Sequence, residues 1–130
     1  MIFHIFGIYP QDYGSYNIRL IESLKDKLSI KVVSLGMLPK KRQLSHVYYK
    51  DNSFKKLSLI KLYKAVKDKK RSFKDAYKFQ FKFDYVINNP HAIFHFHNLQ
   101  NINDQLLDYM IINKIKYVIS LRGYDVTIFP

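Results

Sequence analysis

The sequence contains no cysteine, so it excludes disulfide bonds, thiolate zinc sites and a cysteine nucleophile. It also lacks any apolar run near the roughly 18 residues needed to cross a bilayer. The first residues, MIFHIFGIYPQD, have no basic leader and no small-residue cleavage site, and are typical of a first β-strand rather than a signal peptide. These absences favour a cytoplasmic protein in a reducing compartment.

The 130 residues are enough for one domain with a core of ordinary size. A hydrophobic fraction of 48 % and an aromatic fraction of 16 % exclude a disordered chain. No internal repeat and no low-complexity linker divides the sequence. We therefore expect a single domain over residues 1–130.

The charge is strongly basic, with 22 Lys and Arg against 10 Asp and Glu and a net charge of +12. Residues 50–82 hold 12 of the basic residues and only 3 Asp. This pattern is typical of two solvated helix faces, and it also suits contact with an anionic membrane. Nucleic acid is the less favoured partner, because the sequence has no RNP-like, helix-turn-helix or zinc-finger signature.

Apolar spacing predicts strands that alternate with helices. We expect strands at 2–8, 30–35, 46–49 (an edge strand), 92–96 and 115–121, and helices at 16–28, 54–70 and 101–113. Residues 77–85 alternate as in a strand, but their aromatic residues also recur four apart, and we favour a helix. Parallel strands need long crossovers, so the fold class is α/β, an open, doubly wound and mostly parallel sheet of Rossmann-like form.

Ligands of such sheets collect at the carboxyl ends of the strands, where this sequence places polar residues. Gly14 and Ser15 precede the first helix, whose N-terminus favours a phosphate, although by themselves they fit better an ordinary strand-to-helix turn capped by Ser15. Arg122 can clamp a phosphate or carboxylate, and Asp125 can accept from sugar hydroxyls. Gly123 permits a sharp turn between them, and a helix-capping turn with a surface Arg is the alternative.

Two histidines, His95 and His97, stand two apart on the fourth expected strand and so point to the same side. Zinc would need at least one more protein ligand, and no HExxH or carboxylate-rich motif supplies it. A metal-dependent hydrolase is therefore the lesser alternative, and we expect no metal site. Hydrogen bonds from His97 and Asn98 to ligand hydroxyls are the favoured interpretation.

Three motifs occur in order at these strand ends: YPxxxGS over residues 9–15, HFHN over 95–98 and SLRGYDV over 120–126. With the opening strand, they resemble the N-terminal half of a family 4 glycosyltransferase with the GT-B fold. The resemblance implies a retaining enzyme with two Rossmann-like domains. The N-terminal domain mainly binds a glycan or lipid-linked acceptor, and the C-terminal domain holds a nucleotide-sugar donor, as in polysaccharide biosynthesis.

The sequence departs from this family at two positions. Ser15 stands where relatives often carry a second glycine, and Arg122 stands where many carry a histidine. The catalytic residue is therefore unknown, with Arg122 and Asp125 as the candidates near the transferred sugar. The family needs no cofactor. Nothing matches its C-terminal Glu-x7-Glu motif, so we expect the 130-residue chain to lack the nucleotide-sugar domain and to be inactive alone.

Overall fold

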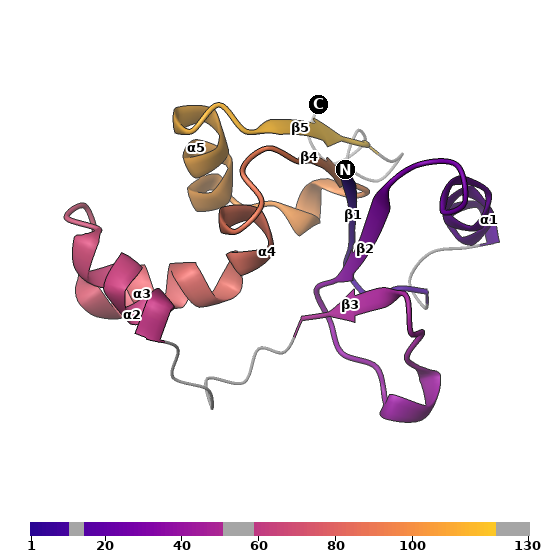
Figure 1. The fold of residues 1–130 in the computed structure, drawn as a ribbon, viewed down its shortest axis with the longest axis horizontal. Helices are drawn as coiled ribbons and strands as arrows, with labels where there is room; N and C mark the ends of the chain where they lie inside the picture. Colours follow the sequence, from indigo (N-terminus) through magenta and orange to yellow (C-terminus); the bar gives the residue numbers. More distant parts are fainter. Residues whose placement is uncertain (11–14, 51–58, 122–130) are drawn as a thin grey trace. The chain divides into compact units, whose positions relative to one another are not determined.

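The computed structural model in Figure 1 describes residues 1–10, 15–50 and 59–121. It divides into two compact units. The first combines Met1–Asp51 with His91–Pro130, and the second is Asn52–Pro90. Each unit is considered by itself below, and the expectation of one domain over the whole chain stays a prediction.

The first unit is built on a five-stranded sheet in which every neighbouring pair is parallel. The strand order is β3-β2-β1-β4-β5. The strands are β1 (Ile2–Phe6), β2 (Ile30–Ser34), β3 (Val47–Tyr49), β4 (Ile93–Phe96) and β5 (Lys116–Ile119). The predicted α/β class is thus confirmed, with a sheet that is wholly parallel among the described strands.

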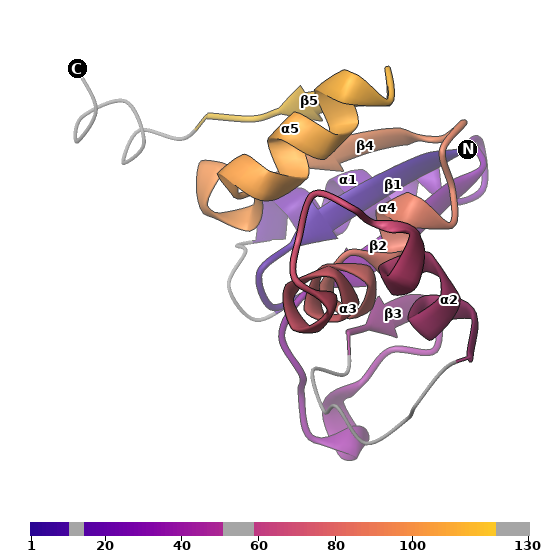
Figure 2. The ribbon, with the colours of Figure 1, turned by 90° about the vertical axis from the view of Figure 1, so that its left-hand side faces the viewer.

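Helices cover both faces of this sheet, as in a Rossmann-like arrangement: α1 (Ser15–Leu24) lies on one face and α5 (Asp104–Ile112) on the other (Figure 2). Alternation along the strands gives each face its own side chains. Ile21 of α1 packs against Phe6 and Val32 on one face. Phe3, Ile5, Phe94 and Phe96 point to the opposite face and are almost completely buried.

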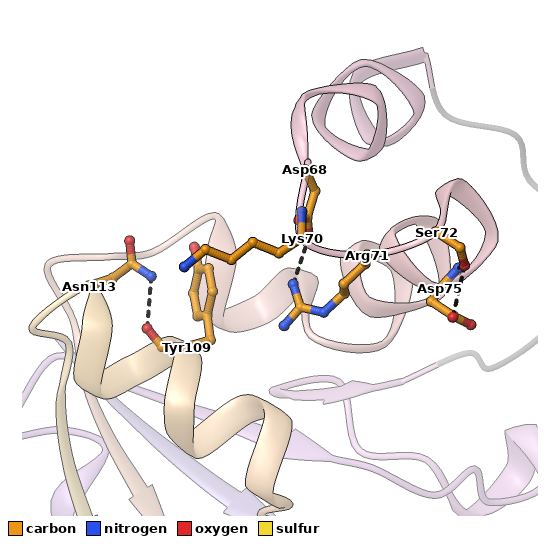
Figure 3. Close-up of polar contacts among 7 residues, drawn as sticks. All are labelled: Asp68, Lys70, Arg71, Ser72, Asp75, Tyr109 and Asn113. Carbon is orange, nitrogen blue, oxygen red and sulfur yellow. Dashed lines mark hydrogen bonds and ion pairs between the residues drawn. The ribbon is translucent and has the colours of Figure 1, made fainter.

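The second unit consists of α2 (Leu59–Lys67), α3 (Phe73–Lys82) and α4 (Asp84–Ile87). The helical interpretation of residues 77–85 is confirmed, with a break at Phe83, whose φ is −115° and ψ 23°. Phe79 and Phe83, four residues apart, meet edge to face with their centroids 4.9 Å apart. Arg71 lies over the ring of Phe79 at 4.2 Å. It also forms a 2.7 Å ion pair with Asp68, which Figure 3 shows. These contacts hold the turn between α2 and α3.

The predicted helix at 101–113 is divided, because two asparagines provide caps. Asn98 accepts a hydrogen bond from the Gln100 N–H and starts the 3-10 helix η2 (Leu99–Asn101). Asn103 accepts from the Leu106 N–H and starts α5. A second 3-10 helix, η1 (Lys40–Arg42), lies between β2 and β3. No helix in the described part of the chain is long and apolar enough to cross a bilayer.

Candidate functional site at the carboxyl ends of the strands

The strand order reverses direction between β1 and β4. The chain moves from β1 to β2 and β3 on one side, and then returns to place β4 and β5 on the other side of β1. In parallel α/β sheets, such a switch point is where ligands bind, outside the carboxyl ends of the strands. Because β1, β4 and β5 are parallel neighbours, the segments that follow them leave the sheet at the same edge.

The segment after β1 is fixed to the end of β2 by hydrogen bonds. Buried Ser34 accepts from the Tyr9 N–H at 3.1 Å and donates to the Gly36 carbonyl at 2.7 Å. The Gly36 N–H in turn donates to the Gly7 carbonyl at 2.7 Å. A methyl group on Gly36 would stand 2.6 Å from Ile8 Cγ1, so the close approach of the two segments suits glycine. Sequence reasoning did not identify Ser34, because its role depends on pairing of β1 with β2.

At the end of β4, the structure places His97 inside the protein. Its backbone N–H donates to the Ile5 carbonyl at 3.1 Å, and its ring stacks on Phe6 with centroids 4.1 Å apart. Only 3 % of His97 is exposed, whereas Asn98 is half-buried and caps η2. Binding of ligand hydroxyls by His97 and Asn98 therefore stays a prediction, and His97 needs a ligand that reaches below the surface.

A third histidine joins His95 on β4 and His97, which lies just beyond the end of that strand. His4 of β1 pairs directly with His95 in the sheet register, so the side chains of His4, His95 and His97 share one face. One ring nitrogen from each lies within 4.8 Å of the other two. His4 Nδ1 and His97 Nε2 are 2.9 Å apart. His95 Nε2 is 2.6 Å from Ser120 Oγ, just beyond β5.

The electrostatic environment keeps two of these rings uncharged at neutral pH. Burial lowers the pKa of His4 to about 4, and repulsion from His95 adds to the effect. Burial also lowers the pKa of His95. Neutral imidazoles carry a lone pair, so they can accept a hydrogen bond or ligate a metal ion. Among the described residues, buried His4 Nε2 has no hydrogen-bond partner.

Sequence reasoning missed His4. The signal was its position in the first strand, where it alternates with the apolar residues Phe3 and Ile5. A histidine on a buried central strand is a candidate partner for His95 and His97, but only the strand order makes the three neighbours.

Four predicted site residues, Gly14, Arg122, Gly123 and Asp125, lie outside the described residues. Ser15 is the first residue of α1, so the helix begins one residue earlier than predicted. The structure thus brings together the ends of β1, β4 and β5, the strands nearest to the predicted site residues. The roles of these residues stay predictions.

No family model, curated protein or solved structure matches the chain. The functional argument therefore depends on the motifs, the strand order and the contacts of the described residues.

Proposed function

We propose that this chain is the acceptor-side half of a retaining GT-B glycosyltransferase, which moves a sugar from a nucleotide-diphosphate donor to a glycan or lipid-linked acceptor. One observation carries the proposal. The YPxxxGS and SLRGYDV segments follow β1 and β5, and HFHN spans the end of β4. These three strands are adjacent and parallel, and they lie on either side of the switch point. Three polar motifs far apart in the sequence therefore start from one edge of the sheet.

Under this proposal the three segments divide the work. Gly14, together with Ser15 at the start of α1, approaches the donor phosphates, where a helix N-terminus stabilises negative charge. Arg122 binds a phosphate or carboxylate through paired hydrogen bonds, and Asp125 accepts from sugar hydroxyls. Basic side chains and helix N-termini stabilise the departing diphosphate. A C-terminal domain supplies most of the nucleotide-sugar site.

The test uses backbone NMR of the 15N-labelled chain, titrated with UDP-glucose, GDP-mannose and a panel of oligosaccharides and lipid-linked glycans. We expect shifts confined to the segments after β1, β4 and β5, and a loss of affinity of about tenfold in Arg122→Ala and in Asp125→Ala, since each removes charge-assisted hydrogen bonds. Arg42→Ala, on exposed η1, is the control for simple charge loss and should bind normally. Shifts that map only to α2 and α3, or equal losses in the control, would contradict the proposal.

A second function, contact with an anionic membrane, is supported by the exposed face of α2. Leu59, Ile60, Tyr63 and Val66 recur at helical spacing and are 84, 68, 61 and 69 % exposed. Lys67 extends over the Tyr63 ring at 4.5 Å, at the border of this apolar face. Basic residues near an anionic surface contribute about 1 kcal/mol each, while apolar side chains enter the interface. We propose that α2 lies on such a membrane, where a lipid-linked acceptor is available.

Liposome co-sedimentation tests this contact. The wild-type chain should bind vesicles of phosphatidylcholine with phosphatidylglycerol and should bind vesicles of phosphatidylcholine alone weakly. Replacing Ile60 and Val66 by Asp should reduce binding at least tenfold. The matched control replaces Ile111 and Ile112 of α5, which are also exposed, by Asp and makes the same change in charge. Binding to DNA in moderate salt without binding to lipid would instead support nucleic acid as the partner.

A further inference from the structure

We propose that His4, His95 and His97 form a binding site for a divalent transition metal of the zinc class, with one coordination position left open. Zinc is commonly held by imidazole nitrogens, and three protein ligands with an open fourth position are typical of its reactive sites. His95 and His97 alone provide two ligands. The third comes from His4, 91 residues earlier in the sequence but directly paired with His95 in the sheet. This inference stands independently of the glycosyltransferase proposal.

The distances are close to those that zinc requires. A tetrahedral ion with bonds of about 2.1 Å holds its nitrogen ligands about 3.4 Å apart. His4 Nδ1 and His97 Nε2 are 2.9 Å apart, so they need to separate by only about half an ångström. All three ligand atoms lie within 4.8 Å of one another, a span that side-chain rotation can close. The ring centroids, 4.0 to 5.3 Å apart, leave the nitrogens grouped rather than spread along the strands.

The His4 ring of the cluster is buried, and its two nitrogens have different surroundings. His4 is 4 % exposed, and its Nε2 has no hydrogen-bond partner among the described residues. Buried polar atoms in folded proteins are nearly always paired, and an unpaired one points to a missing water or ion. Since Nδ1 is the His4 nitrogen that faces His97, an ion in the cluster binds Nδ1, and Nε2 then keeps the ring proton.

Ser120 has the position of a supporting residue. Its Oγ lies 2.6 Å from His95 Nε2. When Nε2 carries the ring proton, it donates a hydrogen bond to Ser120 Oγ. The lone pair of the His95 ring is then on Nδ1. Metal-binding histidines typically donate their other N–H in this way, which fixes the tautomer and the ring orientation.

The surroundings leave one side of the cluster accessible. His95 is half-buried, and Val118, its register partner on β5, is 52 % exposed on the same face. No Asp, Glu or Cys joins the cluster among residues 1–10, 15–50 and 59–121. A site of three neutral ligands keeps the full +2 charge of the ion, so the open position favours hydroxide or an anionic oxygen such as that of phosphate.

The experiment titrates the chelator-treated, untagged 130-residue chain with Zn²⁺ in a calorimeter and with Co²⁺ in an absorption spectrometer. We expect one ion per chain and, with Co²⁺, visible bands of a four- or five-coordinate ion. His4→Ala, His95→Ala and His97→Ala should each weaken binding by at least about a hundredfold. Ser120→Ala should weaken it by about tenfold, in the range seen for groups that support a ligand.

The other two histidines are matched controls, because His46 and His91 are exposed and lie outside the cluster. His46→Ala and His91→Ala should bind Zn²⁺ as the wild type does. His95→Gln, at the half-buried position, decides the matter if the buried variants fail to fold by circular dichroism. Absence of stoichiometric binding, binding that survives His95→Gln, or binding that is lost in either control would overturn the proposal.

Discussion

Tyr9 and Tyr49 are neighbours that use their hydroxyl groups in opposite ways. The Tyr49 hydroxyl accepts from the Leu44 N–H at 3.2 Å and donates to the Tyr9 carbonyl at 3.1 Å. The Tyr9 hydroxyl is buried and has no partner within the described part of the chain. A buried polar group without a partner costs about 1–3 kcal/mol, whereas a satisfied hydrogen bond contributes about 1 kcal/mol.

Phenylalanine substitutions should therefore differ in sign. We expect Tyr9→Phe to leave the free energy of unfolding unchanged or to raise it by about 1 kcal/mol, and Tyr49→Phe to lower it by a similar amount. Urea denaturation at pH 7 measures both. Equal losses in the two variants would show that the Tyr9 hydroxyl has a stabilising partner.

The raised pKa of Tyr9 should also make the stability of the protein depend on pH in the alkaline range. Burial raises the pKa of Tyr9 to about 12, and the charges of Glu22 and Tyr49 add to the shift. The folded state therefore holds the proton more tightly than the unfolded state, where the pKa is near 10. This tighter binding of the proton adds to the free energy of unfolding. The contribution is complete below pH 10 and is lost as the pH rises from 10 through 12. Tyr9→Phe should lose less stability over this interval than the wild type.

At the scale of the element, capping side chains decide where the helices begin. Ser72 accepts from the Asp75 N–H at 3.3 Å and donates to the Asp75 carboxylate at 2.8 Å, at the start of α3 (Figure 3). Asn103 has the same role for α5. Each cap satisfies an N–H group that the helix itself leaves unpaired.

Removal of the α3 cap should loosen the helix that carries the aromatic core of the second unit. We expect Ser72→Ala to lower stability by about 1 kcal/mol and to speed hydrogen exchange in the first turn of α3. Ser72→Asp should preserve protection, because its carboxylate can accept from the same N–H. Ser45→Ala, in an exposed turn, is the control for loss of a hydroxyl. Unchanged exchange in Ser72→Ala would mean that packing alone fixes this helix end.

Helices and strands were predictable where apolar residues recur with a clear period. The spacing of Ile18 and Ile21 predicted α1, and the β-branched run after Ile30 predicted β2. Their ends were less predictable. The division between η2 and α5 depends on which asparagine side chain captures a backbone N–H, which periodicity does not reveal.

At the scale of the whole molecule, the basic residues concentrate in one unit, and the candidate ligand-binding residues lie in the other. Residues 52–90 hold 11 Lys and Arg against 3 Asp, and they include the exposed apolar face of α2. The sheet unit holds the switch point and all three clustered histidines. We therefore expect an electrostatic partner to bind the helical unit and the proposed ligands to bind at the strand ends. The proposed membrane contact of α2 can therefore be tested separately from the proposed ligand sites of the sheet unit.

The sequence by itself determined the α/β class, the alternation of strands and helices, and the shared side of His95 and His97, because these follow from local periodicity and spacing. Only the tertiary structure decided the strand order, and with it the pairing of His4 with His95 and the anchoring of the Tyr9 N–H to Ser34. Such pairings join residues that are distant in the chain. They depend on backbone hydrogen bonding and packing across the sheet, which no short stretch of sequence specifies.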